Sequence, residues 1–515
     1  MPSASLGVAN PTVGGIPGGI IYESTCKCNF ARNYPYAFGP RLGVAYQITP
    51  KTVFRGGIGV AYDGTATAAT GTASASANNA FQAPGFGEAA MQFASGVPQG
   101  YVLPWPNFSP GAYPNPNFPA NLNGPASIVD QNAGRPARQV QWSVGIQREI
   151  TSNTVIEAAY VGNRGAWWLS PVLDNYDAIS LDRLKGVGID INNPADRAIL
   201  RAPIGSPAAG RFQNQLPYAG FPLTSTVAQS LRPYPQFSSG LAPLWAPQGR
   251  TWYDSLQAKA TQRLYKGLEA QYAFTWAKEL QMGTESVGVA PPVPVLVDVF
   301  NRNLDKTLSG FSRPFVSVIS VNYRVPAPSG NKIVSQVVRD WAVGSLLTYA
   351  SGLPILAPAA TGQNISTLMF RSTFYNRDPS QPLFLKDLNC HCIDPTKDLV
   401  LNPQAWVNPT DGQFGNAAPY YNDFRYQRRP SESMSLGRVF QFGTEAHPMR
   451  FTVRMNFTNI FNRLQMSNPT TNPSAPTVRN PATGLLTGGF GFINYIGGST
   501  FLPSRQGTLE MRFSF

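Results

Sequence analysis

The side chains best suited to chemistry in this sequence are four cysteines in two C-x-C pairs. Cys26 and Cys28 form one pair, and Cys390 and Cys392 form the other, with His391 between them. Paired thiols form disulfides in oxidising compartments, and together with a histidine they can also bind a metal. Because the spacing is not a standard zinc pattern, we favour disulfides over a metal site. Four cysteines allow three connectivities, and linking one pair to the other would staple two distant segments.

Other motifs give little support to an enzyme. His391 and His447 are the two histidines, and neither lies in an H-E-x-x-H motif; no G-x-S-x-G occurs. Ser329 and Lys332 form an S-x-x-K within a Pro-rich turn, without companion motifs. The glycines of 56–59 lack the third glycine of a dinucleotide-binding loop and lie in a strand pattern. We therefore predict no catalysis, no cofactor and no resident metal.

Composition narrows the class of protein. Charged residues make up only 13%, whereas aromatic residues reach 12% beside 48 Gly and 47 Pro. Disordered chains are poor in aromatics, so this mixture indicates many strands joined by turn-rich loops. No apolar run approaches the roughly 20 residues of a membrane-spanning helix. The net charge of +13 is scattered rather than clustered, which argues against a nucleic-acid partner.

Several segments of about ten residues alternate strictly between apolar and polar side chains. Residues 140–146 place Val, Trp, Val and Ile on one side, and residues 451–457 place Phe, Val, Met and Phe there. The last segment puts Leu509, Met511, Phe513 and Phe515 on a single side. A period of two identifies strands, and this length crosses a bilayer at a tilt. We predict an all-β fold: a partial antiparallel transmembrane β-barrel of about eleven strands with long extracellular loops.

The connections between these strands alternate between short and long. The predicted strands are 40–48, 53–62, 139–150, 154–162, 253–264, 268–279, 314–325, 338–351, 432–440, 449–461 and 505–515. Short turns are expected at 49–51, 151–153, 265–267, 326–337 and 441–448. Since antiparallel strands reverse direction, all short turns fall at one end and all long loops at the other, as in outer-membrane barrels. Phe515 then lies at the short-turn, periplasmic end. A soluble β-sandwich, the alternative, would not tolerate such long connections.

The polar side of the strands carries most of the wall's charge, and we expect it to face the barrel interior. The charged residues on that side are Arg55, Lys259, Arg263, Glu269, Arg324, Arg450, Arg454, Glu510 and Arg512. They either attract an anion or pair with carboxylates of a plug and line a hydrated lumen, and the second interpretation is favoured. Aromatic residues expected at the membrane interfaces are Tyr46, Tyr62, Trp142, Tyr160, Tyr323 and Phe461.

The same strand segments resemble the C-terminal barrel of TonB-dependent transporters, more closely the Oar-like group with a carboxypeptidase-regulatory-like domain. The similar stretches are 38–63, 141–165, 253–280, 312–326, 341–354, 449–462 (ending in NIFN) and the terminal RQGTLEMRFSF. The resemblance implies active uptake of an unidentified ligand captured by extracellular loops. It also implies a TonB complex, a plug and periplasmic domains of a longer chain, outer-membrane lipid and the barrel-assembly machinery, which reads Phe515.

A complete transporter of that group begins with a signal peptide, a periplasmic domain, a TonB-contacting segment and a plug. Residues 1–10 show no signal-peptide pattern, and eleven strands would be half of a 22-stranded wall. We therefore expect residues 1–39 to be an N-terminal loop remnant and 40–515 the C-terminal part of the barrel, located in the bacterial outer membrane. The alternatives are a surface-adhesion or structural barrel without transport, and a passive porin, which an odd strand count disfavours.

Overall fold

The computed structural model describes most of the chain. The described residues are 2–10, 13–22, 31–63, 94, 128–170, 173–237, 241, 243–283, 298–326, 335, 337–360, 373–444, 447–495 and 504–515. Cys26, Cys28, Ser329 and Lys332 lie outside them. Within them, no helix is long and apolar enough to span a bilayer, a finding that has no bearing on crossing by strands.

One large antiparallel sheet dominates the molecule, and each of its strands pairs with the next along the chain. The strands are β3 (Arg41–Thr49), β4 (Thr52–Tyr62), β6 (Arg138–Thr151), β7 (Thr154–Leu169), β9 (Pro247–Tyr265), β10 (Leu268–Met282), β12 (Phe315–Arg324), β13 (Trp341–Ala350), β18 (Ser431–Thr444), β19 (His447–Thr458) and β22 (Gln506–Ser514). A short twelfth strand, β11 (Lys306–Leu308), lies beside the loop end of β10. The predicted all-β antiparallel architecture is confirmed, with one strand for each predicted segment.

The register keeps apolar side chains together on one face of the sheet. Leu42 lies opposite Ile58, which lies opposite Trp142, and the same face continues through Leu256 to Leu509 at the far edge. Leu42 is 73% exposed and Leu509 is 53% exposed, so the apolar face is open at both edges of the sheet. A one-residue slip would turn every apolar side chain to the polar face, and the regular register excludes it.

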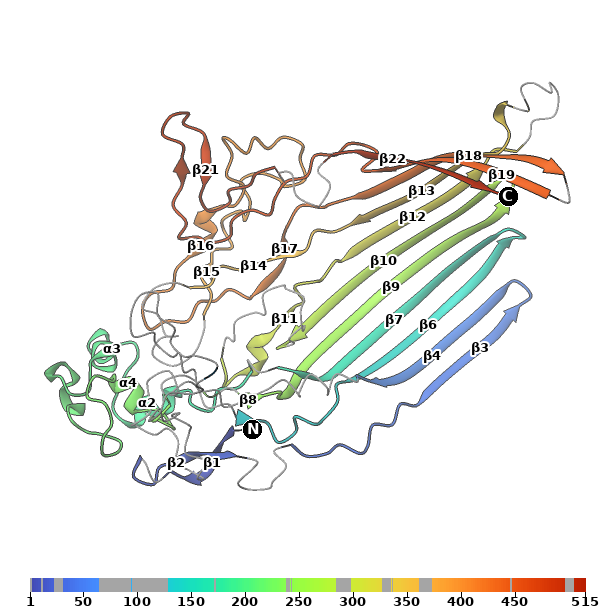
Figure 1. Ribbon diagram of the computed structural model, residues 1–515. Coiled ribbons are helices and arrows are strands. Elements are labelled where there is room, and N and C mark those ends of the chain that lie inside the picture. Colours follow the sequence, from blue (N-terminus) through green and yellow to red (C-terminus); the bar gives the residue numbers. More distant parts are fainter. Residues whose placement is uncertain are drawn as a thin grey trace.

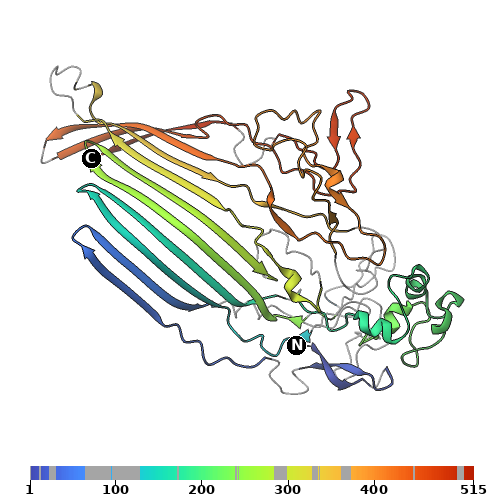
Figure 2. The same ribbon diagram turned by 180° about the vertical axis from the view of Figure 1, so that it is seen from behind.

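Short turns and long connections lie at opposite ends of the strands (Figure 1). The C-terminus lies at the turn end, while the N-terminus lies at the loop end near the helices. Strands β3 and β22 form opposite edges of the sheet in both views (Figures 1 and 2), and within the described part of the chain each pairs on one side only. The sheet is therefore an open wall rather than a closed cylinder.

Several predicted boundaries were wrong. β7 continues to Leu169 instead of ending at 162, β9 begins at Pro247 instead of 253, and β13 begins at Trp341 instead of 338. Residues 441–448 are not a turn, because β18 and β19 pair up to Thr444 opposite His447. Strand β19 ends at Thr458, short of the predicted 461, because Asn459 has a left-handed φ of 48°. Its side chain holds the turn, accepting from the Arg463 N–H at 2.8 Å and donating to the Arg463 carbonyl at 2.9 Å. The NIFN sequence is thus a strand-ending Asn turn.

The long connections fold into compact structure instead of remaining irregular. We call the described residues of 173–246, 352–430 and 459–495 the cap. One buried cluster centres on Phe374, Trp406 and Phe424, and a second lies within 179–228. The short elements of these connections are α2 (Leu181–Gly186), α3 (Pro194–Arg201), η4 (Pro207–Phe212), α4 (Val227–Ser230), β8 (Pro243–Leu244), η5 (Arg302–Asp305), β14 (Pro354–Leu356), β15 (Asn376–Arg377), η6 (Pro403–Ala405), β16 (Trp406–Val407), β17 (Tyr420–Arg425), β20 (Val478–Arg479) and β21 (Leu486–Gly488).

The N-terminal segment also carries structure. Strands β1 (Pro2–Ala9) and β2 (Pro17–Tyr22) form a hairpin, and β5 (Ile128–Val129) pairs with β8. Gln236 of the cap donates to the Pro17 carbonyl at 2.8 Å, which ties the hairpin to the cap. Local sequence explains the cap helices: Pro194 begins α3, and Asn193 caps it by accepting from the Ala195 N–H at 2.9 Å.

Candidate ligand-binding surfaces

The sheet gathers the predicted polar-side charges on a single face. The register places Arg55 opposite Gly145, Lys259 opposite Glu157 and Ala273, and Arg454 opposite Glu510. Glu269 lies opposite Asn322 of β12, and Arg324 follows on the same face of β12 two residues later. Arg450 of β19 and Arg512 of β22 lie on that face as well. Arg263 continues the alternation of β9 two residues beyond Thr261. All nine predicted residues therefore share one face of the wall.

Most cations on this polar face have no carboxylate partner within the described part of the chain. Arg324 is the exception, since its Nη2 lies 3.0 Å from Asp340 Oδ1 in the connection before β13. The predicted cations that form no ion pair with described residues are Arg55, Lys259, Arg263, Arg450, Arg454 and Arg512. A solvated face of this kind presents several guanidinium groups to whatever lies against it.

Five of the six predicted interface aromatics lie on strands with side chains on the apolar face. Tyr46 and Tyr323 lie near the turn ends of β3 and β12, while Tyr62 ends β4 at its loop end. Trp142 of β6 and Tyr160 of β7 lie farther from the turn ends of their strands. The sixth, Phe461, lies in the Asn turn after β19 and is 56% exposed.

A polar group on the apolar face was not foreseen. Tyr160 donates to Asp254 Oδ1 at 2.5 Å, and Arg164 donates to both oxygens of that carboxylate at 3.0 Å each. The Arg164 guanidinium also lies 5.1 Å from the Trp142 ring. These residues come from three strands, and their pairing depends on register, so no local sequence signal announces it. The group satisfies charges that would otherwise be costly beside lipid.

Ion pairs join the cap across long sequence distances. Asp411 accepts from Arg201 Nη2 at 2.6 Å and from Arg197 Nε at 3.1 Å. Both guanidinium groups lower the pKa of Asp411 by stabilising its charged form, the Arg201 hydrogen bond most strongly. This tether joins the 352–430 connection to α3 of the 173–246 connection.

A buried carboxyl lies beneath the same part of the cap. Asp177 is fully buried, accepts from the Tyr234 N–H at 2.8 Å and lies 4.0 Å from Arg232 Nη1. Burial disfavours the charged form and raises the pKa of Asp177 to about 7, although the hydrogen bond and Arg232 act in the opposite direction. Burial also lowers the pKa of Arg232 to about 10. No sequence pattern indicates this pair.

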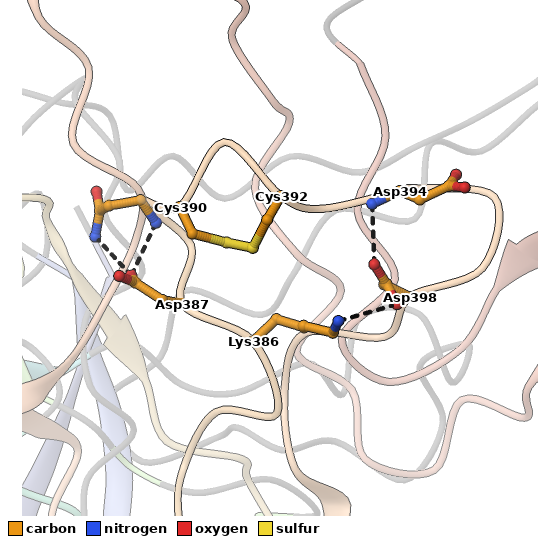
Figure 3. Close-up of a disulfide and its surroundings, with 7 residues drawn as sticks. Lys386, Asp387, Cys390, Cys392, Asp394 and Asp398 are labelled. Carbon is orange, nitrogen blue, oxygen red and sulfur yellow. Dashed lines mark hydrogen bonds and ion pairs between the residues drawn. A yellow bond between two sulfur atoms is a disulfide. The ribbon is translucent and has the colours of Figure 1, made fainter.

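The second C-x-C pair forms a local disulfide. Cys390 and Cys392 are joined to each other, with their Cα atoms 5.1 Å apart (Figure 3). These two cysteines therefore do not staple the loop of Cys26 and Cys28 to their own. Among the described residues, no group of three metal-ligating side chains is close enough to hold an ion.

The last strand carries a run of aromatic contacts at the edge of the wall. The Phe513 ring stacks on Phe442 of β18 with centroids 5.9 Å apart, and Phe515 follows at 5.8 Å. Phe515 is 96% exposed, so it contributes little to packing. Its position at the turn end agrees with the predicted topology.

Comparison with known proteins supplies the family. A family model described as an outer membrane beta barrel domain matches residues 4–506. A search of curated proteins finds no match.

Solved structures show weak likeness. The FpvAI–pyocin S2 complex aligns at 7% identity and TM-score 0.32, over 84% of this chain and 30% of that one. The FrpB iron transporter from Neisseria meningitidis aligns at 9% identity and TM-score 0.32, over 92% of this chain and 39% of that one. The ferric-catecholate import receptor Fiu from E. coli K12 aligns at 9% identity and TM-score 0.24, over 93% of this chain and 49% of that one. This chain thus spans less than half the length of each. From the family match, the chain belongs to the outer membrane β-barrel domain family, whose place is the bacterial outer membrane.

Proposed function

We propose that this chain is the barrel portion of a TonB-dependent receptor that takes up an unidentified ligand, and that it falls in the Oar-like group. The observation that carries the proposal is a folded cap at the loop end of an alternating wall with a cationic polar face. The wall stretches that resemble Oar-like transporters coincide with strands from β3 to β22. The cap would capture the ligand, and the wall would enclose its path.

The charge pattern supports a filled, polar interior. On the polar face, predicted cations outnumber the two predicted carboxylates, Glu269 and Glu510, and most have no ion pair with described residues. A plug with surface carboxylates, or an anionic ligand in transit, would complement these cations. Neither role requires catalysis by the wall.

The open edges support a wall completed by further strands. β3 and β22 run in the same direction, because an odd number of antiparallel strands separates the two edges. A single antiparallel set that closes the sheet must then also contain an odd number of strands, giving an even total. We propose that a longer chain supplies those strands, together with the plug, the periplasmic domains and the contact with TonB.

A surface-adhesion or structural barrel is the second candidate. Its cap would hold a macromolecule without transporting it, and the order within the cap is compatible with such a role. The two candidates differ in energy use, because only the receptor depends on the TonB complex. A passive porin would also transport without TonB.

Cells that carry the gene, cells that lack it and cells with TonB inactivated can be compared for compounds removed from the medium. We expect at least one compound to be depleted only when both the gene and TonB are intact. Depletion that persists without TonB would indicate a passive pore. No gene-dependent depletion, together with gene-dependent attachment to a surface, would favour adhesion.

A further inference from the structure

A large cavity lies where the cap meets the loop end of the wall, apart from the polar face. Its volume is about 860 Å³. The wall supplies its floor through Phe315, Ser317 and Tyr349. The cap supplies its roof through residues 384–389 and 422–428. Its floor side chains lie on the apolar face of the sheet, opposite the cations of the polar face.

The floor is continuous with the apolar face of the wall. Phe315 lies opposite Trp276 of β10, and Ser317 lies between Phe274 and Tyr349 in register. Phe315 is 51% exposed and Trp276 is 56% exposed. Since the apolar face meets lipid in an outer-membrane barrel, the cavity opens at the upper boundary of the membrane. An acyl chain lying along the wall could enter it without leaving an apolar surface.

Most polar groups around the cavity already have partners. Arg425 donates to the carbonyls of Ser312 at 2.6 Å and Gly352 at 3.0 Å. Asp423 pairs with Arg377 at 2.7 Å. Asp387 accepts from the backbone and side-chain nitrogens of Asn389 at 2.9 and 3.2 Å. These groups form the rim of the cavity. A ligand could bind them only by breaking the hydrogen bonds and ion pairs that they already make.

Two cations lie on the rim, one without an ion pair to a described residue and one in a single long ion pair. Arg428 is exposed, and its guanidinium forms no hydrogen bond or ion pair with a described residue, while its backbone N–H donates to Asn389 Oδ1 at 2.9 Å. Lys386 lies 3.7 Å from Asp398 and keeps 44% of its side chain exposed. An ammonium and a guanidinium group above an apolar floor suit a phosphate attached to an acyl chain.

The disulfide adjoins this rim. Cys390 follows Asn389 directly, so the short ring formed with Cys392 lies next to the residue that bonds the Arg428 backbone (Figure 3). The Lys386 side chain points to Asp398, at 3.7 Å (Figure 3). The Asp398 carboxylate also accepts from the Asp394 N–H at 2.9 Å. The loop that presents Lys386 is thereby connected to the segment that presents Arg428.

We propose that this cavity binds a phosphate-bearing lipid of net negative charge from the surrounding membrane leaflet, with its acyl chain on Phe315 and its phosphate between Lys386 and Arg428. The charge of the rim and the apolar floor favour this occupant over a neutral or zwitterionic lipid. Binding would fix the cap against the membrane surface.

Native mass spectrometry of the protein purified from outer membranes tests the assignment. Phosphatidylglycerol and phosphatidylcholine with identical acyl chains are titrated separately, and inorganic phosphate is added as a competitor. We expect phosphatidylglycerol to bind at least about fivefold more tightly, about 1 kcal/mol. Lys386→Gln with Arg428→Gln should abolish this preference, and Ser317→Leu should weaken both lipids by filling the floor.

Arg313→Gln is the matched control. Arg313 is an exposed cation of the same end of the wall, but it does not line the cavity. We expect it to keep the wild-type preference. The proposal fails if the wild-type protein shows no preference, if Arg313→Gln lowers it as much as the double variant does, or if millimolar inorganic phosphate displaces phosphatidylglycerol. Because no uptake is measured, failure here leaves the proposed receptor function standing.

Discussion

Arg201 donates a 2.6 Å hydrogen bond to Asp411, although 210 positions separate the two residues in the chain. Arg197, one turn earlier in α3, shares the same carboxylate at 3.1 Å. One acid therefore links two long connections, which a hydrogen bond from Gln413 to Asn192 at 2.6 Å also joins. Because its pKa is lowered, this contribution is present above about pH 4 and is lost as the pH falls through the depressed folded pKa.

Replacing Asp411 with Asn should loosen α3 without disturbing the wall. Partly exposed ion pairs of this kind contribute about 1 kcal/mol, so amide exchange in α3 should accelerate about fivefold. Asp182→Asn, in the exposed first turn of α2, is the control and should leave α3 unchanged. Hydrogen exchange read by mass spectrometry makes the comparison. Equal protection of α3 in both variants would show that the tether contributes nothing.

The buried Asp177 should make the stability of the cap depend on pH. Its folded pKa of about 7 lies above the ordinary value of 3.8, so the folded cap holds the proton more tightly than the unfolded chain. The contribution of Asp177 to stability is therefore greatest below about pH 4 and falls as the pH rises to about 7, by at most about 4 kcal/mol. Arg232 stays charged throughout this range.

Asp177→Asn keeps the acceptor for the Tyr234 N–H but cannot ionise. We expect the exchange of the Tyr234 amide, corrected for the chemical exchange rate, to become independent of pH between 4 and 7 in this variant. Asp182→Asn should keep the wild-type slope. An unchanged slope in Asp177→Asn would assign the pH dependence to another group.

Phe515 and Phe513 should have separable roles in the last strand. We propose that Phe515 forms part of the signal for barrel assembly, because it is almost fully exposed at the turn end. Phe515→Ala should reduce the amount of assembled protein in outer membranes and leave the stability of that protein within about 0.5 kcal/mol. Phe513→Ala also removes the stack on Phe442, so it should lower both the amount of assembled protein and the stability of that protein. Heat-modifiable migration gives the amount and the midpoint, and normal assembly of Phe515→Ala would contradict the proposed signal.

The sequence predicted the wall well because its signal is local. A period of two placed Arg454 and Glu510 on the polar side, and the register sets them opposite each other. The end of β19 was missed, since a left-handed Asn459 overrode an apolar pattern that continued to Phe461.

The cap could not be predicted in the same way. Asp411 and Arg201 carry no periodic pattern, and their contact depends on how two long connections pack. The same holds for Asp177, which reads as an ordinary loop acid until its burial is known. The polar group of Tyr160, Arg164 and Asp254 depends on register between β7 and β9 rather than on either strand alone.

The central claim is that one face of the wall meets lipid while the other meets an aqueous interior. Nitroxide labels on single cysteines, in protein whose native cysteines are replaced by serine, test it at adjacent positions: Ser143 against Val144, and Gln257 against Leu256. The register puts Val144 and Leu256 on the apolar face and Ser143 and Gln257 on the polar face. In outer membranes, we expect oxygen to relax the labels at 144 and 256, and a water-soluble nickel complex to relax those at 143 and 257. Equal relaxation of neighbouring labels by the nickel complex, or the reverse pattern, would contradict the claim.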